Sequence, residues 1–359
     1  MLRVRGDPEP ARPSRRGPPV QGETGSPIGP KRSPGRARGR RPGASTKGSR
    51  IFSRPKRPHG TKRPEGAQPA RTGPLTGGWR VSSGATHCSV DGRLVPVDQP
   101  ALRPDDRGFA YGDGAFETLR AVDGRPIGLG RHLARLGTTL DALRIPRPPI
   151  DLPEELRRVL LANGLTRGEA CARIRVSRGP GWGARPPPDP RPTVIVDASP
   201  CPPTLDARRA EGMAVVTLQT PRRALPTLKT LAWLPSVVAL LDVPCDAEAI
   251  FCDDDEVLEG ATTNIFALRP GLIWTPPDDG RLLAGVARAV VLTWAAASGL
   301  AVREAPLSRA ALAAGPALLT NALLRAAPVR AVDAVPLPAP DIELLERLHV
   351  AYDALADAT

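Results

Sequence analysis

The sequence predicts an α+β fold in two domains, preceded by a disordered N-terminal tail. Three observations lead to this prediction. Asp-Gly pairs between short apolar runs indicate β-hairpins, leucines at helical spacing indicate amphipathic helices, and a stretch with three prolines, 197–203, separates two such mixed segments. The 359-residue chain is long enough for each domain to bury a core.

The first 80 residues differ in composition from the rest of the chain. They hold 20 Lys and Arg against 4 Asp and Glu, together with 14 Pro and 14 Gly, whereas residues 81–359 hold 30 basic and 33 acidic residues. Such a segment buries too little apolar surface to offset its ordering entropy. We therefore expect residues 1–80 to be disordered, to contribute nothing to catalysis and to bind nucleic acid only nonspecifically if at all. A transit peptide, or sequence upstream of a native start near Val81, are the alternatives.

Residues 81–200 are predicted to form a small α+β domain. Hairpins are expected around Asp91-Gly92, between 88–90 and 94–97, and around Asp123-Gly124, between 116–122 and 126–129. Helices are expected over 133–143 and 153–163, and strands over 170–177 and 192–197. The stretch 197–203 is then interpreted as an interdomain linker because Ser and Pro interrupt the strand pattern.

Residues 201–359 are predicted to form a larger α/β domain. Strands are expected near 213–219, 247–251, 263–268 and 317–320, and helices near 285–298, 306–313 and 341–356. No apolar run reaches the roughly 20 uncharged residues of a membrane span, so no membrane association is expected. Five cysteines without CxxC spacing and only four histidines indicate neither a disulfide framework nor a metal site, which favours a reducing, cytoplasmic compartment.

Lys229 is the only lysine after Lys62, in a region that otherwise uses arginine as its base. A guanidinium stays protonated, whereas a desolvated amine can lose its proton and attack a carbonyl. The apolar neighbours from Leu231 to Leu234 favour the neutral amine. Lys229 is therefore the candidate nucleophile, and a surface lysine spared by chance is the alternative.

Two further charged residues stand out. Glu259 precedes the small residues of Gly260-Ala261-Thr262-Thr263 and a predicted strand, so it is either a buried acid or an exposed acid of the turn that begins at Asp253. Arg135 offers a forked, permanently charged donor that suits a phosphate, and its alternative is a solvated helix arginine.

Several motifs together resemble the class IV aminotransferase family, the fold type IV enzymes that use pyridoxal phosphate. The resemblance rests on Asp106-Arg107-Gly108-Phe109-Ala110-Tyr111-Gly112-Asp113-Gly114-Ala115-Phe116-Glu117-Thr118, His132-Leu133-Ala134-Arg135-Leu136, Lys229, Glu259 with Asn264-Ile265-Phe266, and Leu282-Leu283-Ala284-Gly285-Val286-Ala287-Arg288. It covers residues 86–330 and implies a homodimer whose active sites lie between the two domains.

The resemblance assigns roles to individual residues. It implies that Lys229 forms the Schiff base, that Arg135 binds the phosphate, that Glu259 faces the pyridine nitrogen and that Leu283 lies against the ring. It also implies that Val286 and Ala287 bind the phosphate through their backbone, that Asn321 and Ala322 close this site, and that Tyr111 and Arg185 contact substrate. Without the resemblance, Leu283 would be a core leucine, and Val286 and Ala287 would belong to a helix cap. Asn321 and Ala322 would be a strand end, and Arg185 would belong to a flexible loop.

The closest likeness within the family is to its lyase branch, which converts 4-amino-4-deoxychorismate to 4-aminobenzoate and pyruvate in folate synthesis. Phe116 and Arg185-Pro186-Pro187 stand where D-amino-acid transaminases carry a tyrosine and an Arg-x-His pair, and Phe116-Glu117-Thr118 differs from the Phe-Glu-Gly of branched-chain transaminases. A branched-chain or D-amino-acid aminotransferase remains the alternative. Ala232 and Ala287 depart from the family pattern, and each removes a side-chain hydrogen bond worth about 0.5–1.5 kcal/mol.

Overall fold

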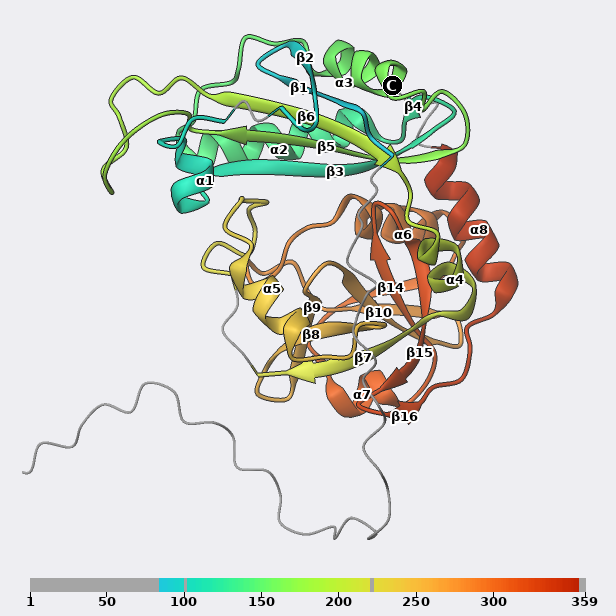
Figure 1. The fold of residues 1–359 in the computed structure, drawn as a ribbon. Coiled ribbons are helices and arrows are strands. Elements are labelled where there is room, and N and C mark those ends of the chain that lie inside the picture. The colour runs from blue at the N-terminus through green and yellow to red at the C-terminus, as the bar shows by residue number, and fades with distance from the viewer. Residues whose placement is uncertain (1–83, 100–101, 220–222, 355–359) are drawn as a thin grey trace, which may run out of the picture. The chain divides into compact units, whose positions relative to one another are not determined.

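The computed structural model describes residues 84–99, 102–219 and 223–354, and the predicted tail over 1–80 lies outside them. Two β-sheets, each accompanied by helices, make up this part of the chain (Figure 1). The α+β class predicted from the sequence is confirmed. A domain boundary at residue 200 stays a prediction.

The first sheet is antiparallel throughout, with the strand order β2-β1-β6-β5-β3-β4. Its strands are β1 (His87–Val90), β2 (Arg93–Pro96), β3 (Gly114–Val122), β4 (Arg125–Pro126), β5 (Glu169–Ser177) and β6 (Thr193–Pro200). The helices of this part are α1 (Arg107–Tyr111), α2 (Leu129–Leu143) and α3 (Leu152–Ala162). Helices α2 and α3 lie on one face of the sheet, and the second sheet lies beyond the other face (Figure 1).

Alternation along β3 and β5 decides which side chains meet the helices. Successive residues of a strand point to opposite faces, and one set, Ala115, Leu119 and Ala121 of β3 with Ala172 and Ile174 of β5, belongs to the buried core under α2 and α3. The intervening residues of both strands therefore face away from the helices, toward the rest of the molecule. Phe116 and Thr118 of β3 are among them.

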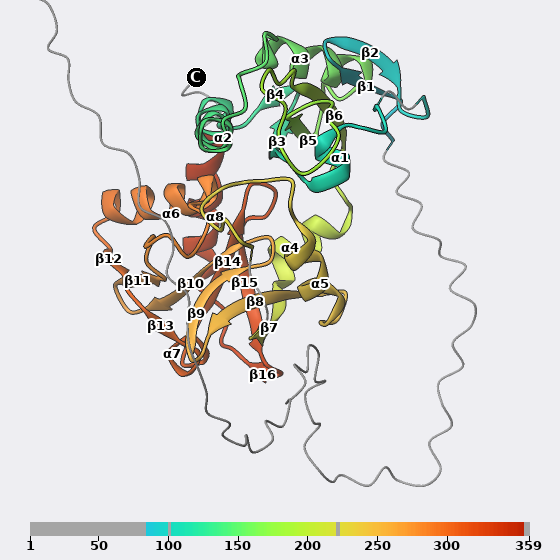
Figure 2. The same ribbon diagram turned by 90° about the vertical axis from the view of Figure 1, so that its left-hand side faces the viewer.

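The second sheet has ten strands and mixes parallel with antiparallel pairs, with the main order β12-β11-β10-β14-β15-β7-β8-β9-β13. Its strands are β7 (Met213–Leu218), β8 (Ala247–Asp253), β9 (Glu256–Gly260), β10 (Asn264–Arg269), β11 (Leu272–Thr275), β12 (Ala301–Glu304), β13 (Leu307–Ser308), β14 (Ala317–Asn321), β15 (Arg325–Val332) and β16 (Val335–Pro336). The accompanying helices are α4 (Thr204–Glu211), α5 (Leu234–Leu241), α6 (Val286–Ala297), α7 (Arg309–Ala313) and α8 (Ile342–Asp353), and α6 lies next to α8 (Figure 2).

Both hairpins predicted from Asp-Gly pairs are confirmed. Asp91 and Gly92 have φ values of 49° and 78°, and Asp123 and Gly124 have values of 47° and 76°. Two consecutive positive φ values are what a two-residue turn of type I′ requires, and Asp followed by Gly tolerates them best. The strand predicted over 126–129 is wrong beyond Pro126, because Leu129 already begins α2.

Two further predictions need correction. Residues 197–200 of the expected linker belong to β6, because each residue from Asp197 to Pro200 pairs with a residue of β5. Only Cys201–Pro203 therefore join β6 to α4. The helix expected over 306–313 begins at Arg309, since Leu307 and Ser308 pair with β9 and the Ser308 hydroxyl caps α7. In the described part of the chain, no helix is long and apolar enough to cross a membrane.

Candidate active site

A cavity of about 560 Å³ is lined by residues from both sheets. Phe116 and Thr118 of β3 contribute from the first sheet, and Glu259 of β9 and Asn264 of β10 contribute from the second. The cavity contains eight of the ten site residues expected from the sequence: Arg135, Lys229, Glu259, Leu283, Val286, Ala287, Asn321 and Ala322. Residues separated by nearly two hundred positions in the chain therefore meet around one space.

Backbone hydrogen bonds join the segment around Lys229 to β3. The N–H of Phe116 donates to the Lys229 carbonyl at 3.0 Å, the N–H of Leu231 donates to the Gly114 carbonyl at 2.9 Å, and the N–H of Lys229 donates to the Thr139 hydroxyl at 3.3 Å. Lys229 thus lies on a segment that pairs with the start of β3, although in the sequence this segment belongs to the loop between β7 and α5.

Two aromatic rings surround the amine of Lys229. Its Nζ lies 4.5 Å from the ring centroid of Phe116 and 5.1 Å from that of Trp233, and the two rings meet edge to face at 5.2 Å. Burial in this environment, together with the guanidinium groups of Arg135 and Arg223, lowers the pKa of Lys229 to about 7. A large share of this amine is therefore neutral, and able to act as a nucleophile or base, near neutral pH.

Glu259 is a buried acid, which excludes the exposed-turn alternative. Its Oε1 accepts from Arg223 Nη2 at 2.6 Å, and its Oε2 accepts from the N–H of Leu283 at 2.9 Å. Burial raises the pKa of Glu259, while the Arg223 guanidinium and the Leu283 N–H oppose that shift because they donate to the charged form. The carboxylate is oriented into the cavity and retains lone pairs for a further donor.

A second buried carboxylate orients Arg135. Both oxygens of Glu117 accept from the Arg135 guanidinium, at 2.8 and 2.7 Å, and Oε2 also pairs with His132 Nδ1 at 2.8 Å. Although burial opposes ionisation, these partners lower the pKa of Glu117 to about 2. The remaining Nη1 of Arg135 donates to the Ala284 carbonyl at 3.2 Å, so the guanidinium spans from β3 to the start of α6.

The start of α6 forms another side of the cavity. Gly285 is the N-cap and has no side-chain capping bond, so the first N–H groups of the helix are open to an anion. A Cβ at Gly285 would lie 2.1 Å from Asn264 Oδ1, which explains why a residue without a side chain stands there. Asn264 also donates to the Leu283 carbonyl at 2.9 Å, which fixes Leu283 at the cavity wall.

The turn between β14 and β15, Asn321–Leu324, closes the cavity on the side of the second sheet. Asn321 Oδ1 accepts from the N–H groups of Leu323 and Leu324 at 2.9 and 2.7 Å. This side chain therefore fixes the shape of the turn from within.

Three of the arginines that line the cavity, Arg173 and Arg175 of β5 and Arg208 of α4, are here called the arginine rim. Arg173 donates to Asp197 at 3.2 Å, and Arg175 pairs with the same carboxylate. The side chains of Arg173 and Arg175 are 36% and 37% exposed, and Arg208 is half-buried. Because Arg173 and Arg175 share a single carboxylate, that of Asp197, the rim suits an anionic ligand.

Tyr111 and Arg185, expected to contact substrate, do not line this cavity. The Tyr111 ring is half exposed and stacks with the Arg107 guanidinium at 4.7 Å from its centroid. The same guanidinium donates to the carbonyls of Gly183 and Ala184 at 2.6 and 3.3 Å. Arg107 thus joins α1 to the loop that contains the exposed Arg185, and both Tyr111 and Arg185 lie outside the described cavity.

Several residues of the site were not expected from the sequence. Trp233, Arg223 and Glu117 contact the predicted residues directly, yet each stands in a segment where a core or surface role looked equally natural. A signal did exist for the arginine rim. Arg173 and Arg175 are two positions apart in a predicted strand, so their side chains share one face.

The residues of the cavity fit pyridoxal phosphate. The uncapped N-terminus of α6 and the half-buried guanidinium of Arg135 suit its phosphate. A buried carboxylate suits its protonated pyridine nitrogen, and a largely neutral amine suits its aldehyde. In that arrangement, Lys229 would hold the aldehyde carbon and Glu259 the ring nitrogen.

Comparison with known proteins agrees with this geometry. The family model for amino-transferase class IV matches residues 114–332. The structure of 4-amino-4-deoxychorismate lyase from Pseudomonas aeruginosa is 31% identical, with a TM-score of 0.62 over 73% of this chain and 97% of that one. A PLP-bound hypothetical aminotransferase from Mycobacterium tuberculosis is 27% identical, with a TM-score of 0.65 over 74% and 98%. The D-alanine aminotransferase of Listeria monocytogenes serotype 1/2a is 26% identical over 255 residues, 68% of this chain and 87% of its own length.

Proposed function

Since this chain belongs to the amino-transferase class IV family and its cofactor is pyridoxal phosphate, we propose that it is a lyase that converts 4-amino-4-deoxychorismate to 4-aminobenzoate and pyruvate. The observation that carries the proposal is the pairing of an apolar enclosure around Lys229 with an arginine rim on the same cavity. The substrate has the same two parts, an amine on a ring carbon and two carboxylates away from it.

The surroundings of Lys229 favour this substrate over an α-amino acid. An α-amino acid carries a carboxylate on the carbon that bears its amine, and that charge would have to lie beside the reacting amine. The rings of Phe116 and Trp233 occupy the space next to Lys229 Nζ, and neither ring carries a charge that could pair with a carboxylate there. Removing a carboxylate from water without a partner is costly, so an amine on an uncharged ring carbon suits this enclosure better.

When bound, pyridoxal phosphate supplies an electron sink for the negative charge that develops at the carbon bearing the substrate amine. Glu259 holds the proton on the pyridine nitrogen through its buried carboxylate. Arg135 and the start of α6 hold the phosphate. Because its pKa is about 7, Lys229 can act as a base at neutral pH once its amine is free.

The same lysine can complete the reaction. Lys229 takes the proton from the ring carbon that bears the amine, and the ether bond between the ring and the enolpyruvyl group breaks. Lys229 then returns that proton to the methylene carbon of the departing enolpyruvyl group, which becomes pyruvate. The ring is left aromatic as 4-aminobenzoate, so atoms and electrons balance without a further reactant.

A class IV aminotransferase is the second candidate, because the arginine rim would also bind a dicarboxylic 2-oxo acid. Incubating the purified protein with 4-amino-4-deoxychorismate, and separately with D-alanine or leucine plus 2-oxoglutarate, distinguishes the two. We expect 4-aminobenzoate and pyruvate in equal amounts from the first reaction, and at least about tenfold slower turnover in the others. Glutamate formation without 4-aminobenzoate would assign the enzyme to the aminotransferases.

We further propose that the enzyme acts as a homodimer in the cytoplasm. Helix α5 presents Leu234, Val237, Val238 and Leu241 to solvent, and side chains of this kind are ordinarily covered by a partner. All five cysteines are free thiols, which suits a reducing compartment. Light scattering on the purified protein should give twice the mass of one chain.

A further inference from the structure

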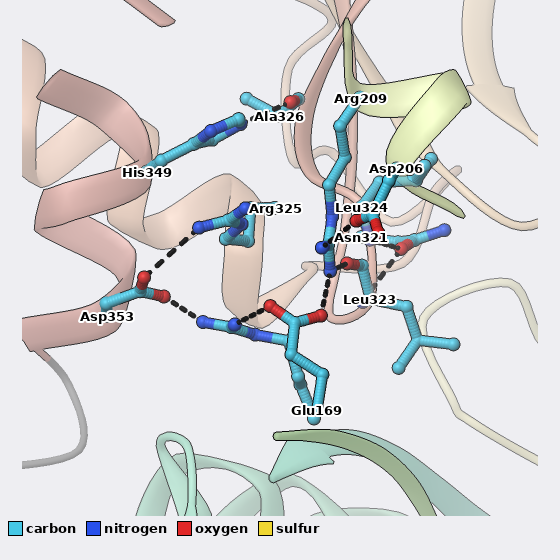
Figure 3. Close-up of polar contacts among 11 residues, drawn as sticks. Glu169, Asp206, Arg209, Asn321, Leu323, Leu324, Arg325, Ala326, His349 and Asp353 are labelled. Carbon is cyan, nitrogen blue, oxygen red and sulfur yellow. Dashed lines mark hydrogen bonds and ion pairs between the residues drawn. The ribbon is translucent and has the colours of Figure 1, made fainter. Parts of the chain in front are cut away.

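Arg209 of α4 is a buried arginine behind the cavity, and its guanidinium joins three separate parts of the chain. Its Nη2 donates to Glu169 Oε2 at 2.8 Å and to the Leu323 carbonyl at 2.6 Å, and its Nη1 donates to Asp206 at 3.0 Å (Figure 3). The residue is only 6% exposed. It does not line the cavity, so the reaction proposed above gives it no role.

The Leu323 carbonyl belongs to the turn that closes the cavity. Asn321 shapes this turn from within, as Figure 3 shows, and Arg209 holds it from behind. A shift of the turn would therefore move Asn321 and Ala322, which face the space assigned to the cofactor.

Glu169 connects the same guanidinium to the arginine rim. It is the first residue of β5, and positions 169, 173 and 175 share one face of that strand. Glu169 also accepts from Arg120 of β3 at 2.5 Å, and Arg120 pairs in turn with Asp353 at the end of α8. Glu169 is thus fixed on the first sheet, on the strand that carries Arg173 and Arg175.

We propose that Arg209 is a positioning residue that sets the spacing between the Asn321–Leu324 turn and the arginine rim. The inference rests on the proposed function, in which one end of the substrate meets the cofactor and its carboxylates meet the rim. Arg209 Nη2 makes both the Glu169 and the Leu323 contacts, and a lysine ammonium, which ends one bond nearer its backbone, cannot reach both groups from the same place. The turn and β5 are separate elements that this guanidinium joins directly.

The test is Arg209→Lys, which keeps the charge and loses the reach of Nη2 to both Glu169 and the Leu323 carbonyl. We expect KM for 4-amino-4-deoxychorismate to rise about tenfold, the effect of losing one hydrogen bond to a charged group, with kcat within about twofold because Lys229 and Glu259 are untouched. Asp206→Ala is the matched control, since it removes the exposed partner of Arg209 and leaves both the turn and β5 attached. Its KM should stay within about twofold of the original value.

A second readout separates this inference from the proposed reaction. Chorismate carries the same two carboxylates and lacks the amine, so its binding to the holoenzyme, measured by calorimetry, does not depend on turnover. We expect Arg209→Lys to weaken chorismate binding about tenfold, and Glu169→Gln added to Arg209→Lys to weaken it little further because both act through one link. Unchanged chorismate affinity in Arg209→Lys, with only a lower melting temperature, would overturn the inference. A wild-type enzyme that binds chorismate but forms no 4-aminobenzoate would overturn the proposed reaction alone.

Discussion

The part of the cavity around Lys229, Glu259 and Arg135, here called the cofactor side, differs from the arginine rim in how tightly its charged groups are held. Around the cofactor, Glu117 and Glu259 are buried and each accepts from at least two donors. On the rim, Arg173 and Arg175 are more than a third exposed and share one carboxylate, Asp197. The first arrangement fixes groups for chemistry, whereas the second leaves arginines accessible to a ligand that arrives from solvent.

This difference assigns separate tasks to the two regions. Rigid, desolvated groups stabilise charge without reorganising during the reaction, so the cofactor side should determine whether any chemistry occurs. Exposed charges mainly attract and orient a charged ligand, so the rim should determine which substrate is bound. Substitutions on the cofactor side should therefore lower kcat, and substitutions on the rim should raise KM.

The largest effect is expected from Lys229→Arg. A guanidinium cannot form the covalent link to the cofactor, so turnover should fall by at least about a thousandfold, while the similar size and charge preserve the fold. The visible absorbance of the covalently bound cofactor should disappear, and circular dichroism should remain unchanged. A variant that keeps both the absorbance and turnover would remove Lys229 from the centre of the site.

A smaller loss is expected from Glu259→Ala. The covalent link should still form, but without its acidic partner the pyridine nitrogen holds its proton poorly, so kcat should fall about a hundredfold. Steady-state kinetics and the absorbance spectrum of the same sample provide both measurements. Loss of kcat with KM within about twofold supports the assigned role, whereas undiminished kcat would exclude Glu259 from catalysis.

A pH effect of about tenfold per unit is expected when pyridoxal phosphate attaches to the cofactor-free protein. Only the neutral amine attacks, and because the pKa of Lys229 is about 7 the attachment rate should rise up to that pH and then level off. The control is the side-chain amine of Nα-acetyl-lysine, which has an ordinary pKa. Its attachment rate should continue to rise up to about pH 10. A protein profile that follows the control would show that burial does not depress this pKa.

The same comparison explains how much could be predicted from the sequence. That Lys229, Glu259 and Arg135 lie at one cavity was predictable because they stand in recognisable motifs, and their roles toward the cofactor stay predictions. Arg223, which binds Glu259, and Trp233, which faces Lys229, were not predicted, since their roles depend on how loops fold over one another. Such contacts between distant segments leave no local pattern in the chain.

The fold shows the same limit. Hairpins with Asp-Gly turns and helices with regular leucines were predicted correctly because their signals are local. The continuation of β6 through Asp197–Pro200 was missed, because pairing with β5 overrides the local tendency of Ser and Pro to end a strand. Tyr111 and Arg185 lie outside the described cavity, and their contact with substrate stays a prediction.

The most direct test of the division between cofactor side and rim is a rim variant assayed for both functions. Arg173→Gln with Arg175→Gln and Asp197→Asn should raise KM for 4-amino-4-deoxychorismate about a hundredfold, since two charged donors are lost. Asp197→Asn alone is the matched control. Both variants lack the Asp197 carboxylate, so they differ only in the two arginines. The account predicts that the dissociation constant for pyridoxal phosphate stays within about twofold in both proteins. An unchanged KM in the triple variant, or a cofactor affinity that falls together with substrate affinity, would contradict it.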